Sequence, residues 1–308
     1  MAERRSQIVL GLDPDPARLW PRALELAQND PAQPTDPAAR AARAVAAHCR
    51  LVLEAAGGEC VAVKPQVACF ERLGSFGWAA LAEVMRAAAD AGLIVIADAK
   101  RGDIDISARA YAQAFFGSTP TPFGAVAGLG ADALTVNPLL GGDSLAPFIE
   151  AARSAGGGVF ALVRTSNPGA ADLQDRLLAD GSTVSEALAR LVDELGRPGV
   201  GEAGLSDVGA VTGATAPERL ESLRQAMPHA VLLLPGIGPQ GGNGRDLAPA
   251  FAPGPAGGLV SASRAIVYAH ERAQSDPGGG AAPAASDPAA AARSEAARLR
   301  ELIWGLYA

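Results

Sequence analysis

Three ionisable residues follow directly on a buried-strand pattern in residues 94–107, IVIADAKRGDIDIS. The run Ile94–Ala97 is apolar throughout, as expected of a parallel strand covered on both faces, and it leads into Asp98, Lys100 and Asp103. Charged groups at the end of a buried strand are costly to remove from water unless they pair. Because α/β folds place their chemistry at the carboxyl ends of parallel strands, we interpret this D-x-K-x-x-D array as part of an active site.

Two earlier strand patterns also end in charged residues. Asp13 follows the first pattern (LGLDPDP), and Lys64 ends the second (VAVKPQ). In a closed barrel these ends meet on one face, so we predict a compact network in which Lys64, Asp98 and Lys100 alternate in charge. Asp103 should lie nearby, and regular alternation along the third strand would point Asp98 and Lys100 to the same side. A network that merely ties strands together is the plainer interpretation, but the phosphate-type motifs described next disfavour it.

A glycine-rich stretch and an arginine later in the chain predict a phosphate site. The sequence PGIGPQGG at 235–242 follows the seventh strand pattern, and its glycines allow backbone N–H groups to approach an anion. Arg264 follows the eighth pattern at the start of a helical stretch, where a bidentate donor would add to the helix dipole. Loops after strands seven and eight are where barrels commonly hold phosphate. A glycine-rich loop alone would more often be a plain turn.

Polar residues also follow the fifth strand pattern, in the sequence VRTSNP at 163–168. Hydroxyl and amide groups at a strand end can hydrogen-bond the polar edge of a heterocycle, although S-N-P is ordinary turn chemistry as well. Arg164 in this stretch could equally be a structural salt-bridge residue, so we assign it no function.

Alternating apolar runs and amphipathic, Ala-rich segments must position these residues. This alternation is typical of a parallel α/β architecture, and the strand count and chain length favour a (β/α)8 TIM barrel over a doubly wound sheet. No G-x-G-x-x-G follows the first strand, which disfavours dinucleotide binding. Strands are expected at 7–12, 60–64, 93–98, 132–136, 158–164, 207–212, 230–234 and 258–262, and helices at 38–56, 76–91, 104–116, 144–154, 184–195 and 217–226.

We expect one domain. Residues 1–271 form the barrel, 272–287 a flexible Gly/Pro/Ala linker, and 288–308 a last helix that packs on the barrel exterior. Asp287 is expected to cap this helix, with a proline at its first position. The long connection 166–183 is a candidate loop over the active face.

Composition and charge limit the classes of function. With 49% hydrophobic and 19% charged residues, the 308-residue chain can bury a large core. The net charge of −7 argues against nucleic-acid or anionic-membrane partners without forbidding an anionic small substrate. No apolar run approaches membrane-spanning length, and the N-terminus turns acidic too soon for a signal peptide, so we expect a cytoplasmic protein. The three cysteines lack metal-like spacing and the three histidines lie far from the motifs, so no metal site is expected.

Together the motifs resemble those of the orotidine 5′-phosphate decarboxylase family, in its longer bacterial (type 2) subfamily. The resemblance runs in order from the first strand to the eighth, over about residues 8–269, and DAKRGDI at 98–104 is its most specific part. It implies cofactor-free decarboxylation of orotidine 5′-monophosphate to UMP in de novo pyrimidine biosynthesis. The other matching segments are GLDPDP at 11–16, VAVKPQ at 61–66, TVNPLLG at 135–141, VRTSNPG at 163–169, VGAVTGAT at 208–215, PGIGPQGG at 235–242 and SRAIVYA at 263–269.

The resemblance also implies roles for individual residues. Lys100 would stabilise negative charge developing at C6 and then protonate that carbon. Asp98 would lie beside the departing carboxylate, either repelling it or holding Lys100, and Lys64 would orient Asp98 and contact ribose. Asp103 would reach the neighbouring subunit's site, which implies an obligate homodimer with shared active sites. The implied substrate-binding residues are Asp13 for ribose, Thr165 and Ser166 for the pyrimidine amide edge, Gly238, Gln240 and Arg264 for phosphate, and Ser107 in place of the family's Thr.

Besides Ser107, four positions depart from the family pattern without touching the four-charge core. Asp105 adds a charge near the expected subunit boundary, and Pro239 removes one backbone N–H from the phosphate loop. Ala265 stands where Gly is common, and Leu139 where an aromatic residue is frequent. We expect activity to survive these changes.

Three alternatives stay open. Metal-dependent sugar-phosphate lyases and aldolases of the same superfamily also carry D-x-K-x-x-D, but they have an acidic metal ligand where Lys64 stands, and a cation there would repel a divalent metal. A Schiff base through Lys64 or Lys100 is disfavoured because adjacent carboxylates keep lysines protonated. A non-catalytic nucleotide-binding barrel would have a decayed site, against which the intact array argues.

Overall fold

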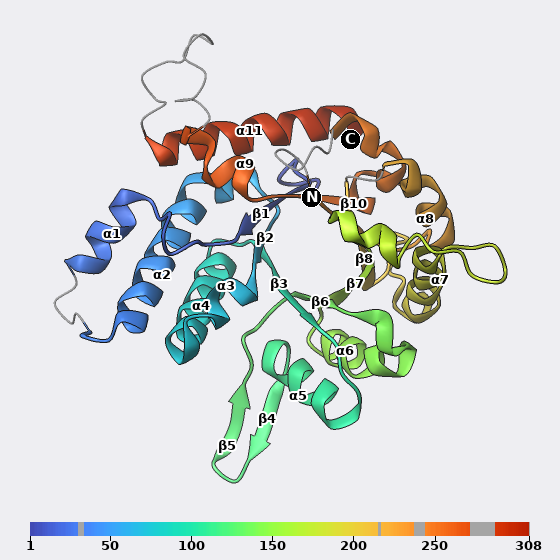
Figure 1. Cartoon of the computed structure of the whole chain (residues 1–308), viewed down its shortest axis with the longest axis horizontal. Helices are drawn as coiled ribbons and strands as arrows, with labels where there is room; N and C mark the ends of the chain where they lie inside the picture. The colour runs from blue at the N-terminus through green and yellow to red at the C-terminus, as the bar shows by residue number, and fades with distance from the viewer. Residues whose placement is uncertain (30–33, 215–216, 237–243, 272–286, 308) are drawn as a thin grey trace.

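The computed structural model describes residues 1–29, 34–214, 217–236, 244–271 and 287–307. Eight parallel strands close into a barrel in the order β1-β10-β9-β8-β7-β6-β3-β2 (Figure 1). All eight expected strands are present, which confirms the predicted (β/α)8 barrel. Their bounds are β1 (Ile8–Leu12), β2 (Ala62–Pro65), β3 (Ile94–Arg101), β6 (Ala133–Val136), β7 (Gly158–Arg164), β8 (Val208–Thr212), β9 (Leu232–Pro235) and β10 (Gly258–Ala262).

The strands are buried on both faces because successive side chains point into two different cores. Ile8 and Leu10 belong to the large core between strands and helices, whereas Val9 between them belongs to a smaller second core. Every barrel strand contributes to this smaller core, which therefore fills the barrel interior. Its strand members are Val9, Ala62, Ile96, Ala133, Phe160, Val211, Leu233 and Leu259.

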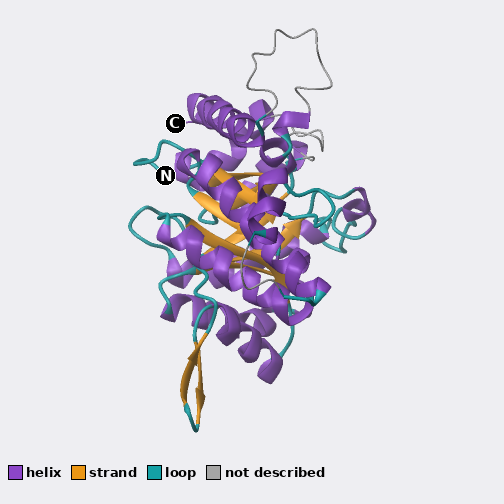
Figure 2. Cartoon of the chain, turned by 90° about the vertical axis from the view of Figure 1, so that its left-hand side faces the viewer, coloured by secondary structure: helices purple, strands orange, loops and turns teal. Residues whose placement is uncertain are grey.

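Helices enclose the barrel on all sides (Figures 1 and 2). Each expected helix is present, and two short ones, α1 and α3, were not expected. The second helix starts where its sequence predicts, because the Asp36 side chain accepts hydrogen bonds from the backbone N–H of Ala38 and Ala39. The helices are α1 (Pro21–Gln28), α2 (Pro37–Ala56), α3 (Val67–Glu71), α4 (Gly74–Asp90), α5 (Asp105–Phe115), α6 (Gly142–Ser154), α7 (Val184–Gly196), α8 (Leu220–Ala226), α9 (Arg264–Val267) and α11 (Pro288–Tyr307).

The C-terminal helix α11 packs against α2 and α9. Asp287 caps it through the backbone N–H of Ala289 at 3.0 Å. Leu299 and Ile303 of this helix are buried, whereas Leu306 is 41% exposed. The linker expected at 272–287 lies outside the described residues apart from Asp287, so the division of the chain into barrel, linker and helix stays a prediction.

A β-hairpin formed by β4 (Ser118–Thr121) and β5 (Gly124–Ala127) projects from the barrel and was not expected (Figures 1 and 2). Its sequence, STPTPFGAVA, lacks the alternation of apolar and polar residues that marks a half-buried strand. Its turn is made by local contacts: the Thr121 hydroxyl accepts from the N–H of Phe123 and donates to the carbonyl of Gly124. Gly124 adopts a φ of +113°, which favours glycine.

His48 lies buried in the core, where its Nδ1 accepts from the backbone N–H of Trp20, and burial lowers its pKa to about 4. Among the described helices, none has the length and apolarity needed to cross a lipid bilayer.

Candidate active site

A cavity of about 420 Å³ opens at the carboxyl ends of the barrel strands, and each strand, or for β1 the residue directly after it, supplies part of its lining. Most of the predicted site residues meet there. Asp103 and Ser107 are not among the lining residues, and Gly238 and Gln240 lie outside the described part of the chain. The predicted residues that line the cavity are Asp13, Lys64, Asp98, Lys100, Thr165, Ser166 and Arg264.

Asp98 is the centre of the charged network predicted from the sequence. It is buried, and its Oδ2 accepts from Lys64 Nζ at 2.5 Å while its Oδ1 accepts from Lys100 Nζ at 2.6 Å. Gln66 Nε2 also donates to Oδ2 at 3.0 Å, and the Thr135 hydroxyl also donates to Oδ1 at 2.9 Å. Four donors therefore fix both oxygens of this carboxylate, and we call Lys64, Asp98 and Lys100 the lysine–aspartate array.

Burial and charge oppose each other in the array. Burial alone would raise the pKa of Asp98, but the ammonium groups of Lys64 and Lys100 outweigh it and hold that pKa well below the ordinary value. Burial alone would lower the pKa of Lys64, but Asp98, and Asp13 in addition, raise it above 10.5. Asp98 and Lys64 are therefore ionised at neutral pH.

The third strand delivers Asp98 and Lys100 to the cavity through an irregularity. Both residues line the cavity, as expected, but regular alternation is not the cause. The ladder between β3 and β6 shifts register between Ala97 and Arg101, and Lys100 adopts a φ of +49°, which is unusual for a residue with a side chain. The Thr135 hydroxyl accepts from the Lys100 backbone N–H at 3.0 Å and so supports this conformation.

The array holds both lysines of the chain. Apart from Lys64 and Lys100, the cationic side chains of this sequence are 24 arginines and three histidines. The two lysines nevertheless differ in access to water: the side chain of Lys64 is 9% exposed and that of Lys100 is 45% exposed. Lys64 is thus a buried counter-charge, whereas Lys100 presents its ammonium group to the cavity.

Sequence reasoning assigned no role to Gln66 or Thr135. Both lie inside recognised motifs, VAVKPQ and TVNPLLG, but neutral polar residues near a strand end carry no charge signal. Only the geometry shows that they complete the hydrogen bonding of Asp98, which leaves no carboxylate oxygen without a donor.

The second half of DAKRGDI lies outside the cavity. Arg101 pairs with Glu71 and lies 5.2 Å from the ring centre of Tyr111, so its role is structural. Asp103 is half-buried, and its Oδ1 accepts from the N–H of the next residue, Ile104. Ser107 lies exposed on α5. The single chain does not use these two residues at its own cavity, and their action in a partner subunit stays a prediction.

Arg264 lines the end of the cavity next to β9 and β10. The long helical stretch expected after it is interrupted: α9 is a single turn, Arg264–Val267, and Tyr268 follows in a non-helical conformation. A helix this short adds little dipole, so the Arg264 guanidinium group is the positive charge that this end of the cavity offers an anion. Gly236 lines the same end of the cavity with a φ of +104°.

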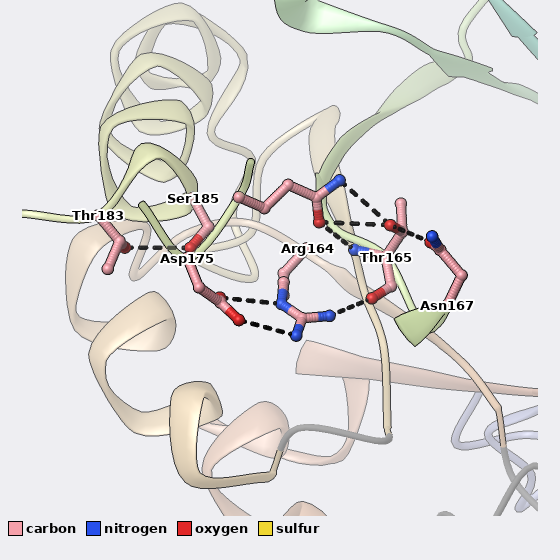
Figure 3. Close-up of polar contacts among 7 residues, drawn as sticks. Arg164, Thr165, Asn167, Asp175, Thr183 and Ser185 are labelled. Atoms are coloured by element: carbon pink, nitrogen blue, oxygen red, sulfur yellow. Dashed lines mark hydrogen bonds and ion pairs between the residues drawn. The ribbon is translucent and has the colours of Figure 1, made fainter. Parts of the chain in front are cut away.

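At the end of β7, Arg164 proves to be the structural ion-pair residue that the sequence left open (Figure 3). Its Nε and Nη2 each donate to one oxygen of Asp175 at 3.0 Å, and its Nη1 donates to the carbonyl of Thr165. The hydrogen bonds from Arg164 lower the pKa of Asp175. Next to this pair, Thr165, Ser166 and Asn167 line the cavity.

Comparison with known proteins identifies the family to which this barrel and its array belong. The sequence model of the "Orotidine 5'-phosphate decarboxylase / HUMPS family" matches residues 6–275. The chain belongs to this family. The resemblance predicted from the motifs over about residues 8–269 is thereby confirmed.

Individual relatives point to orotidine 5′-phosphate decarboxylase within that family. The chain is 48% identical to the orotidine 5′-phosphate decarboxylase of Rhodopirellula baltica over 227 residues, which cover 73% of each chain. It is 39% identical to that of Roseiflexus sp. (strain RS-1) over 301 residues, covering 97% of this chain and 92% of the relative. The structure of Leishmania donovani OMP decarboxylase superposes with a TM-score of 0.69 at 32% identity, covering 97% of this chain and 96% of that chain.

Matches of about 300 residues place the chain in the longer, type 2 subfamily of orotidine 5′-phosphate decarboxylases. Its activity is the decarboxylation of orotidine 5′-monophosphate to UMP, in pyrimidine biosynthesis. The lysine–aspartate array takes Asp98 and Lys100 from the start of the segment DAKRGDI and Lys64 from the end of β2.

Proposed function

We propose that the lysine–aspartate array decarboxylates orotidine 5′-monophosphate without metal or cofactor, and that Lys100 is the catalytic acid. The observation that carries this proposal is the binding of both Asp98 oxygens by the two lysines, with the Lys100 side chain left 45% exposed at the cavity. A fixed ammonium group at that place supplies both positive charge and a proton.

The chemistry makes two demands on the protein. The bond from C6 to the carboxylate carbon breaks, and CO2 leaves. The electron pair of that bond stays at C6 in the plane of the ring, where the π system cannot delocalise its negative charge. The Lys100 ammonium stabilises this charge and then gives its proton to C6, which forms UMP and leaves a neutral amine. Water returns the proton to Lys100 afterwards.

Asp98 serves chiefly to position Lys100. The 2.6 Å hydrogen bond ties the lysine to a carboxylate whose other oxygen is held by Lys64 and Gln66. Such support keeps the ammonium group in place before the substrate arrives, so that little reorganisation is needed during the reaction. Repulsion between Asp98 and the substrate carboxylate is the second effect proposed for this residue, and the two ammonium groups beside Asp98 weaken it.

The remaining cavity residues suit the rest of the nucleotide. Arg264 at the β10 end binds the phosphate, and Asp13 with Lys64 contacts the ribose hydroxyls. Ser166 at the β7 end binds the amide edge of the pyrimidine. Phosphate binding far from C6 supplies energy that organises the site around the reacting carbon. Gly238 and Gln240, which lie outside the described residues, are proposed to bind the phosphate together with Arg264.

The active form is proposed to be a homodimer in which Asp103 completes the partner's site. Apolar side chains beside Asp103 and at the end of the neighbouring strand β6 are exposed to an extent that a subunit contact would explain: Ile104 at 55%, Ile106 at 76%, Leu139 at 63% and Leu140 at 54%. Mixing two inactive variants, Lys100→Ala and Asp103→Ala, should restore activity because one native site forms in each mixed dimer. No recovery after subunit exchange would rule out the shared site.

A metal-dependent sugar-phosphate lyase is the competing activity for a barrel with D-x-K-x-x-D. The donor set disfavours it, because both oxygens of Asp98 are already bound to ammonium groups that would repel a divalent cation. No cluster of three or more His, Cys, Asp or Glu residues suited to a metal occurs in the described ranges.

A spectrophotometric decarboxylation assay tests the proposed function. The wild-type protein, dialysed against EDTA, should convert orotidine 5′-monophosphate to UMP as fast as before dialysis. Loss of activity with EDTA and its return with a divalent metal would favour the lyase, and tight UMP binding without turnover would favour a non-catalytic barrel.

A further inference from the structure

We propose that Arg164, Gln174 and Asp175 form a positioning clamp that holds Thr165 and Ser166 in the conformation needed to bind the pyrimidine. The inference rests on the proposed function, in which Ser166 contacts the amide edge of the base. None of the three clamp residues lines the cavity, so they act through the segment that they hold.

The clamp grips both backbone groups of Thr165. The Gln174 Oε1 accepts from the Thr165 N–H at 2.8 Å, and Arg164 Nη1 donates to the Thr165 carbonyl. Asp175 in turn binds Arg164 with two parallel hydrogen bonds, which fixes the plane of the guanidinium group. The Thr165 N–H is therefore held directly by Gln174, and the Thr165 carbonyl is held by Arg164, which Asp175 fixes in turn (Figure 3).

The clamp also engages the side-chain hydroxyl of Thr165 in hydrogen bonds within the protein. Gln174 Nε2 donates to the Thr165 hydroxyl at 3.1 Å, and this hydroxyl donates to Asn167 Oδ1 at 2.6 Å. Its proton is thereby used inside the protein, so Thr165 has no hydrogen to give to a ligand. Thr165 therefore serves to orient the next residue, Ser166, to which the proposed function assigns the contact with the base.

The opposite side of Ser166 is supported by β8. The N–H of Gly213, directly after β8, donates to the Arg164 carbonyl at 2.7 Å. A Cβ atom at Gly213 would lie only 2.8 Å from the Cα of Ser166, so the glycine allows the two backbones to touch. Ser166 is thus enclosed by the clamp on one side and by Gly213 on the other.

The clamp residues are themselves anchored to the start of α7. The Ser185 N–H donates to the Gln174 carbonyl at 2.9 Å, and the Val184 N–H donates to the Arg176 carbonyl at 3.0 Å. Thr183 begins α7 with a capping box in which it exchanges hydrogen bonds with Glu186. The loop after β7 is therefore fixed to the start of α7, so the position of α7 helps to set the position of Thr165 and Ser166 at the cavity.

Direct anion binding by Arg164 is the main alternative role. Its nitrogens Nε, Nη1 and Nη2 are all engaged within the protein, and its side chain is only 11% exposed. A substrate phosphate would have to displace Asp175 to reach it. Arg164 is therefore a positioning residue.

UMP and ribose 5-phosphate differ in the presence of the base, so comparing their binding distinguishes positioning of the base-binding residues from a general effect on the site. Isothermal titration of Gln174→Met and Asp175→Asn should show UMP binding weakened about three- to tenfold, the usual cost of one misplaced hydrogen bond. Ribose 5-phosphate, which carries no base, should bind as it does to the wild type. The KM for orotidine 5′-monophosphate should rise by a similar factor, with a smaller change in kcat.

Asp180→Asn is the matched control, because it removes a carboxylate from the same loop where Asp180 contacts Ser182 and Arg190. It should leave both affinities unchanged. Equal weakening of UMP and ribose 5-phosphate, or unchanged UMP binding, would overturn the clamp. If Asp175→Asn does not fold, Gln174→Met decides, since it removes no charge. Failure of the wild type to turn over substrate would overturn the proposed function instead. The ratio of the affinities for UMP and ribose 5-phosphate does not depend on turnover, so it would still test the clamp.

Discussion

The ends of β3 and β7 both carry a cationic side chain bound to an aspartate, yet they use it in opposite ways. At β3, Asp98 is buried and Lys100 reaches the cavity with a side chain that is 45% exposed. At β7, the arginine–aspartate pair faces the protein, and Arg164 spends its hydrogen bonds on Asp175 and the Thr165 carbonyl. The first arrangement presents a charged group to the cavity for chemistry, and the second only fixes the conformation of the adjacent backbone.

The residue types explain this difference. A lysine ammonium is a compact charge with a titratable proton, and one carboxylate can hold it without using all its hydrogens. An arginine guanidinium is a planar fork that pairs with both oxygens of a carboxylate and does not release a proton at neutral pH. In a chain with 24 arginines, the two lysines stand where a proton and a point charge are needed.

Exchanging the cation at β3 should have the largest effect. Lys100→Arg keeps the positive charge but removes the transferable proton, so kcat for decarboxylation should fall by at least about 10³-fold. Steady-state assays on the purified variant measure this directly. A kcat within tenfold of the wild type would mean that charge alone suffices and that Lys100 is not the acid.

Removing the charge of Asp98 should affect stability more than any change at β7. Asp98→Asn leaves the buried Lys64 ammonium without its counter-charge, at a cost of about 3–5 kcal/mol in the free energy of unfolding. Asp175→Asn should cost only about 1 kcal/mol, because the Asp175 side chain is 19% exposed, against 7% for Asp98, and an amide oxygen can still accept a hydrogen bond from Arg164. Urea unfolding of both variants gives the two values, and equal losses would contradict the contrast drawn between the two sites.

The pH dependence of stability provides a sharper test of the same site. Because the native pKa of Asp98 lies below its ordinary value of 3.8, its ionised form stabilises the fold at higher pH and this contribution is lost as the pH falls. The difference in unfolding free energy between wild type and Asp98→Asn should be constant above about pH 5 and shrink below pH 4. A difference that stays constant down to pH 2 would show that Asp98 is not charge-stabilised.

Arg264→Ala should chiefly weaken binding. Loss of a charged hydrogen bond to phosphate predicts a rise of about 10- to 100-fold in the KM for orotidine 5′-monophosphate. Arg298→Ala, which removes an exposed arginine paired with Glu295 on α11, is the matched control and should have no effect. An unchanged KM in Arg264→Ala would remove this residue from the phosphate site.

The smallest effect is expected from the reciprocal exchange at β7. Arg164→Lys keeps the charge but cannot form the two parallel bonds to Asp175, so UMP affinity should fall about threefold while kcat stays near the wild-type value. Competition binding and steady-state kinetics report the two quantities. A large fall in kcat with unchanged UMP affinity would assign Arg164 a part in the chemistry.

The barrel and the lysine–aspartate array could be predicted because their signals are strong and local. Eight apolar runs with helical segments between them predict the fold, and charges directly after such runs predict the site. Gln66 and Thr135 could not be predicted, since a neutral side chain gains its role only when folding brings it to Asp98. The hairpin β4–β5 was missed because its sequence lacks the alternation of apolar and polar residues that marks a half-buried strand.

The clamp shows the limit of sequence reasoning more clearly. The loop after Arg164 contains Asp172, Asp175 and Asp180, and each has the charge to pair with the arginine. Spacing alone does not decide between them, because the path of the loop depends on its bonds to the start of α7. Similarly, the one-turn length of α9 follows from the break at Tyr268, within a stretch that reads as continuous helix.

The kcat of Lys100→Ala at saturating orotidine 5′-monophosphate, measured beside its affinity for UMP, tests the central claim most directly. If Lys100 stabilises and protonates C6, kcat should fall by at least about 10³-fold while the dissociation constant for UMP changes less than about tenfold. A kcat within tenfold of the wild type would contradict the assignment of the chemistry to the lysine–aspartate array.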